Sequence, residues 1–245
     1  MDHGFWRAVS GFRIGLRTGV GLSVLLLAAA NVLNNRLAPS AYLLTAPVTA
    51  ALLLAVLHLA GGTWTDAGLG RADLGRGARW AGTLIALVAA VYLVGALLPF
   101  TQGLFSDRRT EGDSGGTVAF EVLVRLPLGT VLLEEIGFRG VLYGLLRKGW
   151  TVRVATIGSS LLFGLWHILP SLHLTDDKPA LGSAFGQSVL GVVVVEAGTV
   201  LFTGLAGVLF CELRRRSGSL LAPAGLHWAT NALGIVTGFL LHALE

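Results

Sequence analysis

The sequence predicts an all-α integral membrane protein, a polytopic bundle of seven transmembrane helices, or eight if the long fourth segment is divided. Three observations predict this fold class. Hydrophobic residues make up 53% of the chain, charged residues make up only 13%, and seven apolar segments follow one another along almost its whole length. Soluble domains carry about 25% charged residues, so this composition does not suit a surface exposed to water.

Each apolar segment comes close to the length that a bilayer requires. A hydrocarbon core about 30 Å thick needs roughly 20 apolar residues in helical form. The segments are residues 13–33, 41–60, 80–100, 117–146, 152–169, 186–212 and 219–243. The fourth is longer than one span requires, and Pro127, Gly137 and Gly140 within it favour a tilt, a kink or a division into two helices.

The segments predict one membrane domain, because no polar block between them is long enough to fold separately. Residues 1–116 supply three N-terminal spans and a polar loop, and residues 117–245 carry most of the intramembrane ionisable groups. The net charge of +4 comes from small groups of arginines between the spans. Since no continuous basic face is present, we expect the bilayer as a partner and no nucleic acid.

The basic residues also predict an orientation. Four alternate connections, 1–17, 61–79, 146–154 and 212–218, each hold three Lys or Arg residues. The opposite connections hold Arg36, Arg108, Arg109 and Lys178. Because basic residues near span ends concentrate on the cytoplasmic side, we expect a multi-pass protein of the cell membrane with a cytoplasmic N-terminus and a C-terminus outside.

Ionisable groups inside the predicted spans require explanation, because each costs about 2.5–3.5 kcal/mol at the bilayer centre even on lenient scales. Glu121 and Arg125, four residues apart, are best explained as a structural ion pair. Glu196 either forms an interhelical hydrogen bond or lines a cavity. The other intramembrane polar groups that we consider are Glu134, Glu135, Arg139, His167, His227 and Asn231.

Four of these groups are predicted to lie at one depth. Glu134 precedes Arg147 by 13 residues, and His167 follows Arg153 by 14. His227 and Asn231 follow the last arginine of the 212–218 connection by 11 and 15 residues. At about 1.5 Å per residue, each count corresponds to roughly 16–23 Å from the basic end of a helix. Four groups on three helices can therefore form one site.

Helical spacing separates the roles of the two adjacent glutamates. Glu135 and Arg139 are four residues apart and share a helix face, so we expect a structural ion pair. Glu134 points about 100° away from Glu135. We expect Glu134 to face a polar cavity and to act as a general base toward water, a role that burial of a carboxylate favours.

The remaining groups complete a hydrolytic mechanism. His167 would hold the water and later protonate the leaving amine, while His227 and Asn231, also four residues apart, would donate hydrogen bonds to an oxyanion. Zinc is an alternative, because Glu134, His167 and His227 are an acceptable ligand set with one position open to water. The sequence does not require a metal, and it contains neither H-E-x-x-H nor G-x-S-x-G.

Three motifs occur in order on the predicted helices. E-E-x-x-x-R lies at residues 134–139, F-x-x-x-H at 163–167 and H-x-x-x-N at 227–231, the last preceded by G-S-L-L-A-P at 218–223. Together they resemble the CAAX prenyl protease and bacteriocin-processing family of intramembrane peptidases. The resemblance covers about residues 117 to 240, so residues 117–245 correspond to a peptidase core.

The resemblance implies an intramembrane endopeptidase in which Glu134 and His167 activate water and His227 with Asn231 stabilises the oxyanion. The substrate would be a peptide or a membrane-tethered protein. Whether it is prenylated stays open, because eukaryotic members cleave prenylated CAAX proteins whereas some bacterial members are linked to peptide maturation or bacteriocin self-immunity. The alternative function is a non-catalytic membrane binding or self-immunity protein that keeps the polar cluster for structure.

Overall fold

The computed structural model describes residues 13–107, 112–172, 174–185 and 188–244, and every regular element within these residues is helical. Seven helical runs are long and apolar enough to cross a membrane. They are Leu16–Leu37, Pro39–Leu59, Arg71–Leu97, Gly115–Gly149, Val152–Ser171, Val189–Ser217 and Leu221–His242. The predicted all-α membrane fold is confirmed, and the count is seven because the fourth run is not divided.

The first three runs are built from three long helices. The first consists of α2 (Leu16–Val32) and a π-helical turn, η1 (Leu33–Leu37), and the second begins with the 3-10 turn η2 (Pro39–Ala41) and continues as α3 (Tyr42–Leu59). The third consists of η3 (Arg71–Asp73) and α4 (Leu74–Leu97). The short elements α5 (Pro99–Gln102) and η4 (Gly103–Phe105) follow at the far end of the bundle.

The fourth run changes its helical form several times. It consists of α6 (Gly115–Phe120), the π-helix η6 (Glu121–Val131), α7 (Leu132–Glu134), the π-helix η7 (Glu135–Leu142) and α8 (Tyr143–Gly149). Pro127 lies inside η6 and cannot donate a backbone hydrogen bond, so the ladder of helical hydrogen bonds is interrupted at this residue. The wider π turns keep the fourth run a single continuous helix, whereas the sequence also allowed its division into two helices. Such turns occur frequently at functional sites.

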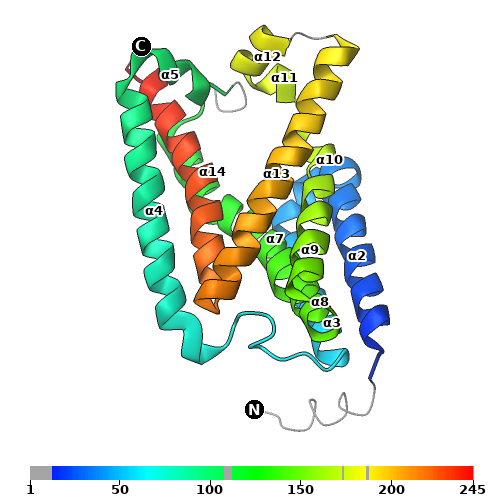
Figure 1. Cartoon of the computed structure of the whole chain (residues 1–245). Coiled ribbons are helices and arrows are strands. Elements are labelled where there is room, and N and C mark those ends of the chain that lie inside the picture. The colour runs from blue at the N-terminus through cyan, green and yellow to red at the C-terminus, as the bar shows by residue number, and fades with distance from the viewer. Residues whose placement is uncertain (1–12, 108–111, 173, 186–187, 245) are drawn as a thin grey trace.

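The last three runs complete the bundle. The fifth consists of α9 (Val152–Trp166) and α10 (Ile168–Ser171), and the short helices α11 (Leu174–Asp177) and α12 (Pro179–Phe185) lead to α13 (Val189–Ser217) and α14 (Leu221–His242). Figure 1 shows α4 beside α14, with α13 crossing toward α9. The fourth run contacts α2, α3, α9, α13 and α14. It is therefore the central helix of the bundle, and the motif residues lie on it or on its neighbours.

Close packing of α9 against α13 depends on glycine. A Cβ atom on Gly164 would lie 2.6 Å from the carbonyl oxygen of Val200, and one on Gly207 would lie 3.0 Å from the Cα atom of Ser160. Small residues at membrane helix interfaces permit such backbone approach. This packing fixes α9, and with it the end of the helix that carries Trp166 and His167.

The connections that carry most of the basic residues meet at one end of the bundle, which we call the basic end (residues 13–17, 60–79, 146–153 and 212–220). The guanidinium of Arg214 donates to the carbonyl oxygens of Thr65 and Asp66 at 3.0 and 3.2 Å. Arg76 donates to the carbonyl oxygen of Ser217 at 2.6 Å. The amide of Ile14 donates to the carbonyl oxygen of Leu59 at 3.1 Å.

The opposite end is joined by an ion pair of 2.8 Å between Lys178 and Asp107. Alternate connections thus lie at opposite ends of the bundle. The prediction of a cytoplasmic side from the Lys and Arg residues in these connections requires this arrangement. Of the basic residues counted there, Arg7, Arg108 and Arg109 lie outside the described residues.

Candidate active site

The fourth run carries three buried charged side chains next to one another. Glu134 closes α7, and Glu135 opens η7, which also carries Arg139. Glu134 is 6% exposed, Glu135 is 2% exposed and Arg139 is fully buried. Charges removed from water in this way must compensate one another, because an unpaired buried charge is strongly destabilising.

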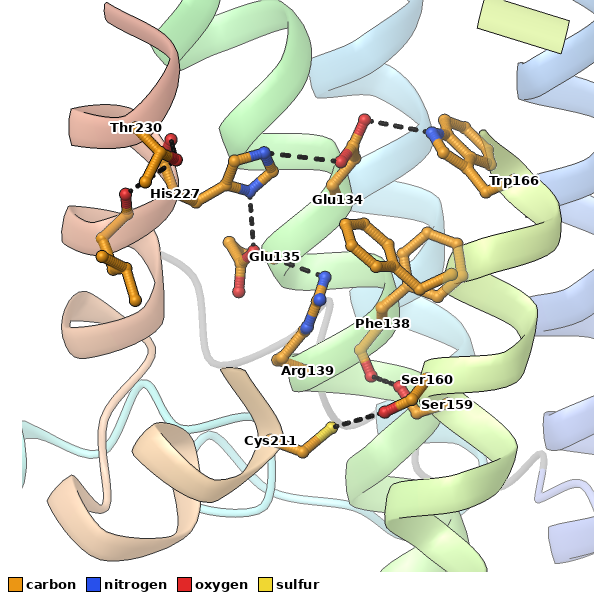
Figure 2. Close-up of polar contacts among 12 residues, drawn as sticks. Glu134, Glu135, Phe138, Arg139, Ser159, Ser160, Trp166, Cys211, His227 and Thr230 are labelled. Carbon is orange, nitrogen blue, oxygen red and sulfur yellow. Dashed lines mark hydrogen bonds and ion pairs between the residues drawn. The ribbon is translucent and has the colours of Figure 1, made fainter. Parts of the chain in front are cut away.

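His227, from α14, lies between the two carboxylates (Figure 2). Its Nδ1 atom is 2.9 Å from Oε1 of Glu135, and its Nε2 atom is 3.7 Å from Oε2 of Glu134. Because a carboxylate oxygen accepts, Nδ1 carries the hydrogen that is donated to Glu135. Glu134 and His227, predicted from the sequence to lie at one depth, thus face each other.

Trp166 provides a partner that the sequence analysis did not identify. Its indole N–H, at the end of α9, donates to Oε1 of Glu134 at 3.0 Å. The indole is only 8% exposed, and a buried Trp N–H usually finds an acceptor. Trp166 immediately precedes His167 in the F-x-x-x-H motif, and this position is the feature of the sequence that could have identified it as a site residue. Glu134 is thus enclosed between an indole and an imidazole, where the sequence analysis expected a polar cavity.

Arg139 forms the ion pair that its spacing from Glu135 predicted, with Nη1 3.4 Å from Oε1. None of its three guanidinium nitrogens has a hydrogen-bond partner among the described residues. Two aromatic rings cover it instead: the guanidinium carbon lies 3.7 Å from the ring centroid of Phe163 and 4.7 Å from that of Phe210. Cation–π attraction of this kind strengthens when the cation is desolvated.

The same two rings orient His227. Phe210 stacks on the imidazole with ring centroids 5.4 Å apart, and Phe163 meets it edge-on at 6.2 Å. Phe163 belongs to the predicted F-x-x-x-H motif, whereas Phe210, on α13, was not singled out in the sequence analysis. Fixing the ring plane of His227 determines where its Nε2 atom points.

His167 follows α9 directly and is half-buried. Its Nδ1 atom donates to the carbonyl oxygen of Phe163 at 2.8 Å, since a carbonyl can only accept. In the neutral ring, Nε2 therefore bears a lone pair. Phe163 contacts His167 edge-on at 4.6 Å between ring centroids. The described contacts include no hydrogen bond between His167 and Glu134.

Asn231 lies one turn beyond His227 on α14, as the four-residue spacing predicted. One N–H of its amide donates to the carbonyl oxygen of His227 at 3.1 Å, and the residue is exposed. Its second amide N–H is available to another acceptor.

The other intramembrane charges lie away from this cluster. Arg125 and Glu121 form the expected ion pair at 3.2 Å, with the arginine side chain about half exposed. Glu196 accepts a hydrogen bond of 2.9 Å from the hydroxyl of Ser171, which is the interhelical explanation left open by the sequence. Ser159 donates to the carbonyl oxygen of Phe138 and joins α9 to η7.

The possible zinc ligands do not all lie together. Among the described residues, no three His, Cys, Asp or Glu side chains gather as a set that could hold a metal ion. In this structure Glu134, His167 and His227 therefore do not form the zinc-binding set that the sequence left open.

The ion pair between Glu135 and Arg139 gives a prediction about stability. Arg139→Met should lower the free energy of unfolding by about 3–5 kcal/mol, because it leaves Glu135 buried without its cation. The double variant Glu135→Gln/Arg139→Met should lose less than the sum of the single changes. Chemical unfolding in detergent micelles measures these differences.

Arg125→Met is the matched control, because it removes the same residue type from an exposed pair on the same helix. Its cost should stay below about 1 kcal/mol. Equal costs for Arg139→Met and Arg125→Met would show that burial does not strengthen the inner pair.

A comparison with protein families links this site to known proteins. Residues 117–233 match the family model described as type II CAAX prenyl endopeptidase Rce1-like. The matched region contains all three motifs and the cluster of Glu134, Glu135, Arg139 and His227. The searches of curated proteins and of solved structures gave no match. Over residues 117–233, slightly under half of its length, this multi-pass membrane protein is similar to the Rce1-like type II CAAX prenyl endopeptidases.

Proposed function

We propose that this protein is an intramembrane endopeptidase in which Glu134 is the general base that activates water. One observation carries this proposal. Oε1 of Glu134 accepts from Trp166 at 3.0 Å, while Oε2 has no hydrogen-bond partner among the described residues and faces Nε2 of His227 at 3.7 Å. One oxygen is thus anchored and the other is available for a proton.

The charges of the cluster favour proton transfer. With both glutamates ionised, Arg139 cationic and His227 neutral, the four side chains carry one net negative charge. One additional proton makes the cluster neutral, which reduces the cost of burial in an apolar environment. A group of side chains that gains stability from one transient proton is suited to take a proton from water and to return it to a leaving group.

The distance between Oε2 of Glu134 and Nε2 of His227 supports a position for the water near these two atoms. A separation of 3.7 Å is too long for a direct hydrogen bond. With Nδ1–H directed to Glu135, the neutral imidazole presents a lone pair toward a carboxylate oxygen, and two acceptors require a hydrogen between them. Since 3.7 Å leaves no room for a water between the two atoms, we propose that the nucleophilic water binds to one side of them and donates to Oε2 of Glu134 as it attacks the peptide carbonyl.

Two further residues are assigned to the later steps. His167 is the proposed acid for the leaving amine, because its free Nε2 atom can take up a proton and then release it. Asn231, through its second amide N–H, and His227 are the proposed donors to the oxyanion. The one proton that Glu134 takes from water passes to Nε2 of His227, 3.7 Å away, which then donates to the oxyanion, and when the intermediate collapses the same proton moves through Nε2 of His167 to the leaving amine. Glu135 and Arg139 are positioning residues that hold His227.

The proposed substrate is a peptide or a membrane-tethered protein, in keeping with the family description. An apolar cavity of about 160 Å³ lies between α2 and α9, and one of its walls is Trp166, whose indole donates to Glu134. Trp166 and Phe138 line its inner side, and Leu27 and Leu165 are among its other walls. Such a cavity suits an apolar substrate group next to the scissile bond, and comparing prenylated with unmodified peptides tests that preference.

The role of Glu134 predicts the effect of its substitution. Glu134→Gln and His167→Ala should each lower kcat by about 10²–10⁴-fold, the usual contribution of a general acid or base. The measurement uses purified protein and a library of membrane peptides, with cleavage products identified by mass spectrometry. Metal analysis of the same active preparation tests the zinc alternative directly.

Glu121→Gln is the control, because Glu121 lies on the same run but pairs with exposed Arg125 and, among the described ion pairs, with no member of the cluster. It should cleave like the wild type. Unchanged cleavage in both Glu134→Gln and His167→Ala would eliminate this mechanism. No cleavage by the wild type, together with an unchanged cellular phenotype in Glu134→Gln, would favour a non-catalytic binding protein.

The hydrogen bond from Trp166 to Glu134 predicts that its loss lowers kcat and leaves KM nearly unchanged. Trp166→Phe keeps the ring and removes the donor to Glu134, so kcat should fall roughly 10–100-fold, as expected for a lost hydrogen bond to a charged group, while KM changes little. Trp228→Phe is the matched control, since the Trp228 indole donates to the carbonyl oxygen of Val122 at 2.8 Å and does not contact Glu134. Equal losses of kcat in the two variants would contradict the positioning role.

We also propose that the basic end faces the cytoplasm, which places the first described residues inside and the end of α14 outside. Single cysteines can be introduced at Ala72, at the basic end, and at Ser106, at the opposite end, both of which are exposed. In intact cells, a membrane-impermeant thiol reagent should label Ser106→Cys, and it should label Ala72→Cys only after permeabilisation. The reverse pattern would invert the orientation.

A further inference from the structure

A second polar site lies at the basic end, away from the carboxylates. There, a cavity of about 290 Å³ opens between the loop after α3, the helix α8 and the last turn of α13. The ionisable residues that line it are Asp66, Tyr143, Arg147, Lys148, Arg214 and Arg215. Four cations thus share one small cavity with a single lining carboxylate.

Two of the lining side chains are buried and held in place by the protein. Tyr143 is 4% exposed, and its hydroxyl interacts with the side chain of Thr156. Arg214 is 7% exposed, and its Nη2 atom donates to the carbonyl oxygens of Thr65 and Asp66. These contacts fix a hydroxyl and a guanidinium in the wall of the cavity.

The charges around the cavity are not balanced by the protein. Lys148 pairs with Asp66 at 3.4 Å, and Arg215 pairs with Glu212 at 2.7 Å. The carboxylate of Asp66 is only partly buried, and hydrogen bonds from Thr63 and Lys148 hold its pKa below the usual range, so it stays ionised near neutral pH. Arg147 and Arg214 have no carboxylate partner among the described ion pairs. The cavity therefore retains a positive excess.

The position of the cavity indicates how a ligand reaches it. It lies where α8 ends at Gly149 and α13 ends at Ser217, at the level where membrane helices meet lipid headgroups. Planar guanidinium groups with a nearby hydroxyl are suited to the several oxygens of a phosphate group. We propose that this cavity binds a phosphate group, supplied at the membrane surface by the headgroup of an anionic phospholipid.

The experiment measures lipid binding by the full chain. Protein in nanodiscs of phosphatidylcholine with increasing phosphatidylglycerol is released and analysed by native mass spectrometry, and thermal unfolding in detergent is followed with added phosphatidylglycerol or with inorganic phosphate. The wild type should retain phosphatidylglycerol in preference to phosphatidylcholine. Arg147→Glu should weaken retention by about tenfold or more, and Tyr143→Phe should weaken it severalfold.

Arg153→Glu is the matched control, because Arg153 is an exposed arginine at the same end that does not line the cavity. It should retain lipid within about twofold of the wild type. Equal weakening by Arg147→Glu and Arg153→Glu would show diffuse attraction to the bilayer and would overturn the proposal, as would retention that Arg147→Glu and Tyr143→Phe leave unchanged.

The thermal-unfolding measurements with phosphatidylglycerol and with inorganic phosphate distinguish the two sources of a phosphate group. Stabilisation by phosphatidylglycerol that Arg147→Glu abolishes supports a lipid headgroup, and the same behaviour with inorganic phosphate alone supports the phosphate site with a soluble ligand. If Arg147→Glu leaves lipid binding intact but raises KM for peptides with a free C-terminal carboxylate and not for their amides, the cavity recognises peptide and the proposal is wrong. Lipid binding should persist in Glu134→Gln, so this result does not depend on the proteolytic function.

Discussion

The rest of the structure depends on one constraint: two carboxylates, a guanidinium and an imidazole are buried together in an apolar protein. Arg139 and the two glutamates come from the fourth run, and His227 comes from α14. None of these groups can be separated from its neighbours without leaving a charge in a medium of low dielectric constant. The packing of α14 against the fourth run therefore has to be specific, and the hydrogen bond between His227 and Glu135 fixes its register.

Aromatic rings complete this arrangement where hydrogen bonds do not. Arg139 is enclosed by Phe163 and Phe210, which lie on α9 and α13, so two more helices are tied to the same cation. The ring faces accept the guanidinium without requiring further polar groups in the core. A lysine would keep the charge but would lose the planar contact with these rings. Glycines between α9 and α13 then allow the two helices to approach closely enough for both rings to reach Arg139.

Features that follow from local rules could be predicted from the sequence. Hydropathy and length located the seven spans, and a spacing of four residues identified the pairs Glu135 with Arg139 and Glu121 with Arg125. Whether the fourth segment was one helix or two could not be decided, because Pro127 permits both outcomes and only neighbouring helices select one.

Interhelical details escaped the same rules. Counting residues from the arginine clusters placed Glu134 and His227 at one depth, but not the direction in which either side chain points. Trp166 and Phe210 were missed because an indole or a phenyl ring in a membrane span ordinarily contributes only to hydrophobic packing. Their importance depends on side-chain orientation across helices, which the spacing within one helix does not encode.

The loop that follows α3 has a consequence for how the protein is assembled during synthesis. Its carbonyl groups accept from Arg214 of the sixth run, and its Asp66 pairs with Lys148 of the fourth. Likewise, α4 packs chiefly against α14, which is translated long after it. Since membrane segments leave the ribosome in chain order, the second connection and the third span must wait in the bilayer for partners translated much later. The N-terminal half is thus inserted first, but its contacts are completed only after the later helices have been inserted.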